Sequence, residues 1–199
     1  MDSRSSKGAV ILHGTDAHPV QAWQPWLREQ FERRDYRVLH PERPENHRPS
    51  KQTYNEFLLG QNWDYTDNIL VGHSSGTTAI LNLLAEKEFP RVRVVVMVAA
   101  FLVKPTSEQA TEFGFETDQF DALFPPGGFD WAYLRKKCES FYFVHSADDP
   151  YCPVVFAEEA AQKLDGQMIY IENGGHLGAR SGLTELPSVV TKLEVDGVL

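Results

Sequence analysis

Short apolar stretches alternate with longer amphipathic ones along most of the chain. Six apolar stretches rich in Val, Ile and Leu predict strands, at residues 9–13, 36–40, 68–71, 92–100, 140–145 and 167–172. Several of them are apolar without interruption, which indicates a sheet whose two faces are both covered. Strands that alternate with helices are typical of a parallel sheet. We therefore expect an α/β fold of about six parallel strands with helices on both faces.

Amphipathic stretches between the strands predict the covering helices, at residues 21–34, 76–88, 154–164 and around 186–193. In the second of these, Ile80, Leu83 and Leu84 fall three and four positions apart, so that one apolar stripe can face the sheet. A weaker helix is expected at residues 51–60, after a proline-rich connection. Residues 101–131 show no sustained period, and we expect an irregular connection there, in the position of a lid.

Composition and charge narrow the function classes. With 199 residues and 42% hydrophobic content, the chain is long enough for one packed domain, which we expect to span residues 1–199. The formal charge of −9 repels phosphate backbones and anionic membrane surfaces, so neither nucleic acid nor a membrane is an expected partner. The longest apolar run, residues 94–103, is too short to cross a bilayer and predicts a buried strand instead.

The N-terminal segment and the cysteines predict a cytosolic (cytoplasmic) protein. Residues 1–14 have a polar start and a short apolar run without a small-residue cleavage site, so no secretory signal is expected. Cys138 and Cys152 are too few for a disulfide framework and are expected to be reduced thiols. The histidines show no spacing typical of a metal site, and there is no Walker loop or dinucleotide-binding glycine motif. We therefore expect neither a metal nor a cofactor.

The segment NILVGHSSGTTAILNLL carries the strongest chemical signal in the chain. An apolar strand runs into G-x-S-x-G, and an amphipathic helix follows, which is the context of a nucleophile elbow. Ser74 then sits at the sharp turn, while Gly72 and Gly76 leave room where side chains would collide with the neighbouring strand and helix. The alternative is a serine that merely caps a helix. The context predicts that Ser74 is a catalytic nucleophile.

A serine hydroxyl needs a base within hydrogen-bond reach, and the base needs an orienting acid. The chain offers both in the order typical of α/β-hydrolases. FVHSADDPYCP follows the fifth strand and YIENGGHLG follows the sixth, so His176 is the expected base and Asp148 or Asp149 the expected acid. The carboxyl ends of parallel strands share one edge of the sheet, where these distant residues can converge.

The chain resembles the small serine hydrolases grouped around retinoblastoma-binding protein nine, over most of its length. The matching segments are AVILHG, the W-x-x-W of Trp23 and Trp26, GHSSG, DWAYLRKKC, DDPYCP and GGH. This resemblance implies a minimal α/β-hydrolase core without a large cap domain. It also implies that the aspartate immediately before Pro150, which is Asp149, is the triad acid. No L-x-C-x-E motif surrounds either cysteine, so no retinoblastoma-type partner is inferred, and protein partners stay unknown.

The loop after the first strand reads HGTDAHP, with one glycine where many lipases and esterases carry several. We expect one oxyanion donor to be the backbone N–H of Ser75 and the other to be that of Thr15 or Asp16. Candidates for the wall of the substrate pocket are Trp23, Trp26 and Phe101, with core packing as the alternative for the two tryptophans.

The expected function is that of a serine hydrolase with esterase activity, which cleaves small carboxyl esters or related acyl compounds through an acyl-enzyme. The Phe-rich segment 101–131 favours a compact apolar pocket for a small-molecule acyl substrate. Two alternatives remain, a protein-binding module with a vestigial triad and an acyltransferase in which an alcohol or amine replaces water.

Overall fold

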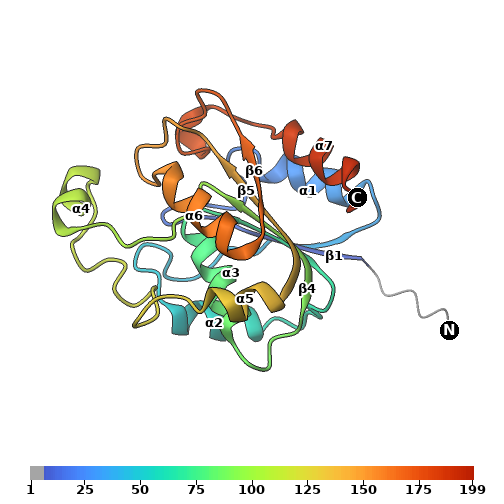
Figure 1. Cartoon of the computed structure of the whole chain (residues 1–199), viewed down its shortest axis with the longest axis horizontal. Helices are drawn as coiled ribbons and strands as arrows, with labels where there is room; N and C mark the ends of the chain where they lie inside the picture. Colours follow the sequence, from blue (N-terminus) through green and yellow to red (C-terminus); the bar gives the residue numbers. More distant parts are fainter. Residues whose placement is uncertain (1–6) are drawn as a thin grey trace.

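The computed structural model describes residues 7–199 and is built on a parallel sheet of six strands (Figure 1). The strands are β1 (Gly8–Leu12), β2 (Arg37–Leu39), β3 (Ile69–His73), β4 (Val92–Val98), β5 (Cys138–His145) and β6 (Gln167–Tyr170). Their order in the sheet is β2-β1-β3-β4-β5-β6, and every neighbouring pair is parallel. The order changes direction between β1 and β3, where the chain starts a second series of crossovers, and clefts at such switch points commonly bind ligands. The predicted α/β fold is confirmed.

Helices cover both faces of this sheet (Figure 1). Helices α1 (Gln24–Glu32) and α7 (Pro187–Val195) pack on one face, and α2 (Lys51–Leu59), α3 (Ser75–Ala85), α5 (Trp131–Lys136) and α6 (Val154–Leu164) pack on the other. Successive side chains of a strand point to opposite faces. In β4, accordingly, Val94 and Val96 belong to the core beneath α1 and α7, whereas Val95 and Met97 belong to the core around α3. The two cores, one on each face of the sheet, explain why the central strands are largely apolar on both faces.

The segment at residues 101–131 is more ordered than the sequence pattern indicated. It contains α4 (Ser107–Phe113), which begins at a capping box: the Thr106 hydroxyl accepts from Gln109 N–H, and the Gln109 side chain accepts from Thr106 N–H. The helix ends at Gly114 in the left-handed conformation. The expectation of an irregular connection was therefore wrong for these residues. Within the described segment between β4 and α5, α4 is a short helix and no large cap domain is formed.

The first predicted helix also needs correction. It begins at Gln24 rather than at residue 21, because Pro25 occupies the first turn, where its missing N–H has no intrahelical partner to lose. Helix α5 was not predicted at all; the Asp130 carboxylate caps it by accepting from Tyr133 N–H at 2.9 Å.

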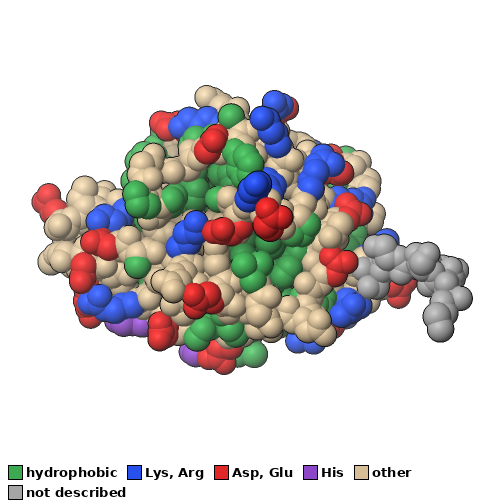
Figure 2. Space-filling model, turned by 90° about the horizontal axis from the view of Figure 1, so that it is seen from below, with side chains coloured by type: hydrophobic (Ala, Val, Ile, Leu, Met, Phe, Trp, Pro, Cys, Tyr) green, Lys and Arg blue, Asp and Glu red, His purple; other side chains and the backbone are tan. Residues whose placement is uncertain are grey.

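The surface carries charges of both signs. Figure 2 shows acidic and basic side chains interspersed on the face of the molecule that is seen from below. This face therefore offers no continuous basic surface. Across the described residues, charges of opposite sign form ion pairs, such as Arg91 with Glu139 at 2.9 Å and Arg135 with Asp165 at 2.6 Å. Within residues 7–199, no helix combines the length and the apolar character that a bilayer-spanning helix needs. Cys138 and Cys152 are free and buried, as expected for reduced thiols.

Candidate active site

Ser74 lies in the turn between β3 and α3, in a backbone conformation that few residues adopt. Its φ is 52° and its ψ is −124°, which places a residue with a side chain in a region that costs on the order of 1–3 kcal/mol. Tight packing enforces the turn: a Cβ added to Gly76 would lie 2.5 Å from Leu12 O, and one added to Gly72 would lie 2.7 Å from Thr77 N. The two glycines of G-x-S-x-G therefore let β1, β3 and α3 approach closely, and the turn presents the Ser74 side chain to a cavity.

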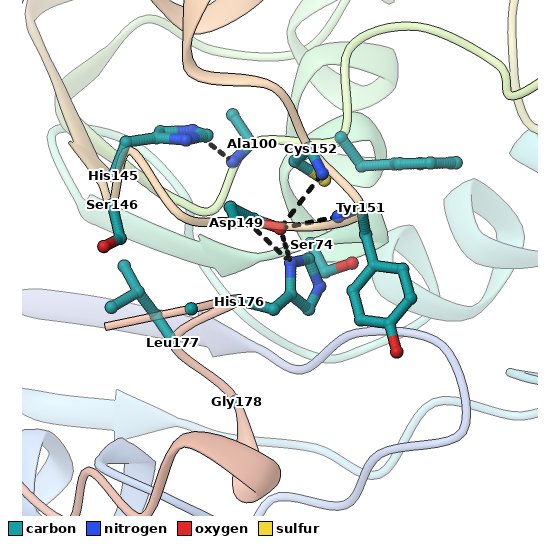
Figure 3. Close-up of polar contacts among 12 residues, drawn as sticks. Ser74, Ala100, His145, Ser146, Asp149, Tyr151, Cys152, His176, Leu177 and Gly178 are labelled. Atoms are coloured by element: carbon teal, nitrogen blue, oxygen red, sulfur yellow. Dashed lines mark hydrogen bonds and ion pairs between the residues drawn. The ribbon is translucent and has the colours of Figure 1, made fainter. Parts of the chain in front are cut away.

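Asp149 and His176 form a direct pair behind this serine. The Asp149 carboxylate oxygens lie 3.0 and 2.9 Å from His176 Nδ1 (Figure 3). The carboxylate also accepts from the backbone N–H groups of Tyr151 at 2.9 Å and Cys152 at 3.0 Å, and its side chain is fully buried. Because a carboxylate only accepts, the proton of a neutral His176 lies on Nδ1, and Nε2 is left free as a base. Figure 3 shows the Ser74 side chain next to this imidazole ring.

Asp148 has a different task from its neighbour. One of its oxygens accepts from Gly175 N–H at 2.9 Å, in the loop that carries His176, and it also accepts from the Ser146 hydroxyl. The hydrogen bond from Ser146, followed by the one from Gly175, lowers the pKa of the Asp148 carboxyl. The structure thus brings Asp149, and not Asp148, against the imidazole, and it uses Asp148 to tie the ends of two loops together.

The predicted oxyanion donors lie along the wall of the same cavity. Ser75, Thr15 and Asp16 all line it. Ser75 is the first residue of α3, so its N–H is among those that have no acceptor inside the helix. The Thr15 hydroxyl donates to the Ser75 hydroxyl at 2.8 Å and fixes the loop after β1 beside the elbow. The role of these N–H groups stays a prediction.

The cavity has a volume of about 640 Å³ and an aromatic wall. The aromatic side chains that line it are Phe101, Phe113, Phe115, Phe120 and Tyr151. They contact one another edge-on or tilted; the rings of Phe115 and Phe120 are 5.2 Å apart and those of Tyr151 and His176 are 5.0 Å apart. This wall continues directly to His176, so an apolar group bound there would lie close to the Ser74 hydroxyl.

The placement of Trp23 and Trp26 corrects the sequence-based expectation. Neither is among the residues that line the cavity, whereas Phe101 is. Trp23 is completely buried in the core beneath α1, where its indole Nε1–H donates to the Leu177 carbonyl at 2.7 Å. Trp26 packs against the same core. The tryptophans therefore pack the fold instead of forming the pocket wall. The wall comes from α4, its flanking loops and Tyr151 in the turn after β5.

His73 is the residue that the sequence analysis overlooked. It is the x of G-x-S-x-G, it is 5% exposed, and its Nε2 lies 2.9 Å from the His176 carbonyl oxygen. Burial, as the largest cause, lowers the pKa of His73 to about 3. The sequence around His73 gives no sign of this contact, because its partner lies in a loop 103 residues further along the chain.

One group of described residues has donor atoms close enough together for a metal ion. Asp149, Cys152 and His176 each offer one donor atom, and these three atoms lie within 4.8 Å of one another. The Asp149 carboxylate, however, is already used by the imidazole and two backbone N–H groups. Burial raises the pKa of the Cys152 thiol well above its usual value, and a neutral thiol is a poor ligand. The arrangement therefore favours an acid–imidazole pair over a metal centre.

Comparisons with known proteins find similarity over most of the chain. A family model described as serine hydrolase matches residues 9–195. The putative hydrolase YdeN of Bacillus subtilis is 26% identical over 187 residues, which cover 92% of this chain and 93% of YdeN. Serine hydrolase RBBP9 of Rattus norvegicus is 23% identical over 171 residues, which cover 84% of this chain and 86% of RBBP9.

A solved structure extends the similarity to the fold. The crystal structure of the ydeN gene product from B. subtilis matches with a TM-score of 0.79 and 25% identity, covering 95% of this chain and 97% of the other. The expected resemblance to small serine hydrolases of the RBBP9 group is confirmed by these matches, and so is the expectation of an enzyme. The chain belongs to the serine hydrolase family.

Proposed function

We propose that this hydrolase cleaves small carboxyl esters or related acyl compounds, with Ser74 as nucleophile, His176 as base and Asp149 as acid. The observation that carries the proposal is the pair of contacts from the buried Asp149 carboxylate to His176 Nδ1, beside a serine in a strained elbow. Together they supply the base that a serine hydroxyl needs and the group that orients this base.

In the proposed cycle, the Ser74 oxygen attacks the carbonyl carbon of the ester while His176 Nε2 takes the hydroxyl proton. The tetrahedral intermediate collapses, the acyl–oxygen bond of the substrate breaks, and the departing alcohol receives the proton from His176. Water then attacks the acyl-enzyme, with His176 as base again, and releases the carboxylic acid and the free serine. Asp149 stabilises the imidazolium that forms in both halves of the reaction.

The negative oxygen of each tetrahedral intermediate needs donors that are already in place. The Ser75 N–H at the start of α3 and an N–H of the loop at Thr15 and Asp16 are the candidates, since all three residues line the cavity. The positive end of the α3 helix dipole adds to this stabilisation.

The aromatic wall supports an apolar acyl group as the bound part of the substrate. Phe101, Phe115 and Phe120 line the cavity, and a volume of about 640 Å³ suits a small molecule. We therefore place the acyl chain against these rings, with its carbonyl carbon at Ser74.

The proposal is tested with a fluorophosphonate probe, which reacts covalently with activated serines. We expect the wild-type protein to be labelled on Ser74, as read by mass spectrometry of the labelled peptide, and Ser74→Ala to remain unlabelled. Ser188→Ala is the control, because it removes an exposed serine hydroxyl on α7 that does not line the cavity, and it should be labelled like the wild type. A panel of chromogenic esters of graded acyl length then gives the preferred substrate.

Other outcomes identify the alternatives. A folded wild-type protein without Ser74-dependent labelling would overturn the proposal in favour of a binding module. Labelling at Ser74 together with product formation that depends on an added alcohol or amine, and not on water, would replace hydrolysis by acyl transfer.

A further inference from the structure

The loop that carries His176 holds an unfavourable backbone conformation. Leu177 has a φ of 51° and Gly175 a φ of 52°, on either side of the base. The left-handed region suits glycine, but for a residue such as Leu177 it costs on the order of 1 kcal/mol. The Leu177 side chain is completely buried in the core beneath α1 and α7, so this conformation is fixed rather than transient. Interactions elsewhere must therefore compensate for it.

Two buried side chains from distant parts of the sequence bind this loop. His73 Nε2 donates to the His176 carbonyl at 2.9 Å, and Trp23 Nε1 donates to the Leu177 carbonyl at 2.7 Å. A carbonyl oxygen only accepts, so the proton of a neutral His73 must be on Nε2. Two consecutive carbonyls are thus held by aromatic N–H donors, both from side chains that are at most 5% exposed.

The His73 ring has little freedom to leave this position. A Cβ on Gly178 would lie 3.2 Å from its Cε1 atom, and a Cβ on Gly14 would lie 3.2 Å from its Nδ1 atom. The edge of Trp23 meets the ring at a centroid distance of 6.1 Å and an interplanar angle of 80°. Gly14 and Gly178 therefore allow the loop after β1 and the loop that carries His176 to pack on either side of the His73 imidazole. Since burial lowers the pKa of His73 to about 3, the ring stays neutral in the range where hydrolases work.

We propose that His73 and Trp23 are positioning residues for the base: they hold the backbone at His176 and Leu177 so that the His176 imidazole stays aligned with the Ser74 hydroxyl. The inference rests on the proposed function. His73 is the last residue of β3, directly before Ser74, so the same strand end fixes the nucleophile and, through one hydrogen bond, the base. The two residues act through His176 and not on the reacting atoms.

Four variants test the proposal by the rate constant of fluorophosphonate labelling and by kcat and KM for a chromogenic ester. His73→Leu removes the donor, His73→Gln offers an amide N–H at a similar reach, and Trp23→Phe removes the indole N–H but keeps a ring. Leu193→Ala is the control, because it removes buried atoms from the core at α7, away from the cavity.

We expect His73→Leu to lower the labelling rate and kcat by about 10- to 100-fold, because a base displaced by a fraction of an ångström loses alignment. Trp23→Phe should lower both less, and His73→Gln should recover most of the loss. KM should change little, since the aromatic wall is untouched. The control should lower the melting temperature without changing the labelling rate of the folded protein. A purely structural role would make the His73 variants behave like this control.

A measurement on the wild-type protein tests the two hydrogen bonds themselves, so the inference can be overturned even if a variant does not fold. Nitrogen-15 NMR should show His73 as the Nε2–H tautomer, and the Nε2–H of His73 and Nε1–H of Trp23 should be protected from solvent exchange. An Nδ1–H tautomer, or equal labelling rates for wild type and a folded His73→Leu, would overturn the inference. If instead the wild-type protein were not labelled at Ser74, the proposed function itself would fail, so the two failures are distinguishable.

Discussion

Asp149 faces His176 with both carboxylate oxygens, at 2.9 and 3.0 Å from Nδ1, while Asp148 turns to the loop that carries the same histidine. The difference arises within the turn after β5. Asp149 closes the turn by accepting from the N–H groups two and three residues further on, which directs its carboxylate inward, where it is fully buried. Of the two adjacent aspartates, Asp149 therefore binds the His176 ring and Asp148 binds the backbone of the loop that carries it.

This division predicts unequal effects of the same substitution. Asp149→Asn should lower kcat for an ester by about 10³-fold or more. The N–H groups of Tyr151 and Cys152 would hold the amide oxygen, so that the NH2 group donates to His176 Nδ1 and favours the wrong tautomer, and a neutral amide does not stabilise the imidazolium. Asp148→Asn should lower kcat by less than about tenfold, since an amide oxygen can still accept from Gly175 N–H. Steady-state kinetics on the two purified variants measures the difference. Equal losses would mean that the carboxylate at Asp149 has no special role.

The glycines of the elbow predict a second contrast, in stability. Gly76→Ala should lower the free energy of unfolding by about 3 kcal/mol or more, because its Cβ would lie 2.5 Å from Leu12 O, and backbone cannot yield as a flexible side chain can. Gly182→Ala is the control: no atom lies within 4 Å of its Cβ, and only the φ of 70° opposes alanine, at a cost of about 1 kcal/mol. Urea unfolding measures both. A mild effect at Gly76 would contradict the close approach of α3 and β1.

Much of the fold follows from local patterns, because the central strands are largely apolar on both faces and each crossover is long enough for a helix. The strand order also explains why residues after β3, β5 and β6 meet, since parallel strands end at one edge. The choice between Asp148 and Asp149 was different. The local sequence does not distinguish the two adjacent carboxylates, and only the family pattern indicated Asp149. The structure places Asp149 against the imidazole.

Other features depend on long-range packing that a sequence pattern does not contain. Trp23 and Trp26 have helical spacing, which predicts an apolar helix face. A pocket wall and a hydrophobic core both use such apolar side chains, so the sequence does not distinguish them, and the structure places both residues in the core. The contact of His73 with the His176 carbonyl joins residues 103 positions apart. Helix α4, in contrast, left a readable signal in Thr106, Gln109 and Gly114, the capping box and the terminal glycine.

Buried histidines predict a loss of stability in acid. Burial, as the largest cause, lowers the pKa of His13 and His145 to about 4 and that of His73 to about 3. In the unfolded chain, histidines bind a proton near pH 6.5, so the unfolded state holds more protons between these values. The free energy of unfolding should therefore have its full value above about pH 6.5 and decrease as the pH falls toward 4. Urea unfolding at several pH values measures the slope.

A single substitution isolates one histidine in this series. His145→Gln should flatten the slope, because glutamine does not titrate and can still accept the Ala100 N–H that His145 Nε2 accepts at 2.6 Å. Val144→Ala provides the control, because it alters the preceding buried residue of β5 without removing a titratable group, and it should leave the slope unchanged. An unchanged slope in His145→Gln would show that this ring is not the source of acid sensitivity.

The aromatic wall predicts a change of acyl preference. Phe115 lines the cavity and packs against Phe120 and Tyr151, at centroid distances of 5.2 and 6.1 Å. Phe115→Ala should widen the cavity and raise kcat/KM for an octanoyl ester relative to an acetyl ester by about tenfold, since each methylene accommodated in an apolar pocket is worth about 1 kcal/mol or more.

The matched control for this change is Phe129→Ala. Phe129 packs against Trp131 and the core but does not line the cavity, so its removal should leave the octanoyl-to-acetyl ratio unchanged while lowering stability. The comparison separates pocket shape from general loosening, because both variants lose the same side-chain atoms. If the ratio moved equally in both, the acyl chain would not lie against Phe115, and the wall that selects it would have to be sought on the opposite side of Ser74.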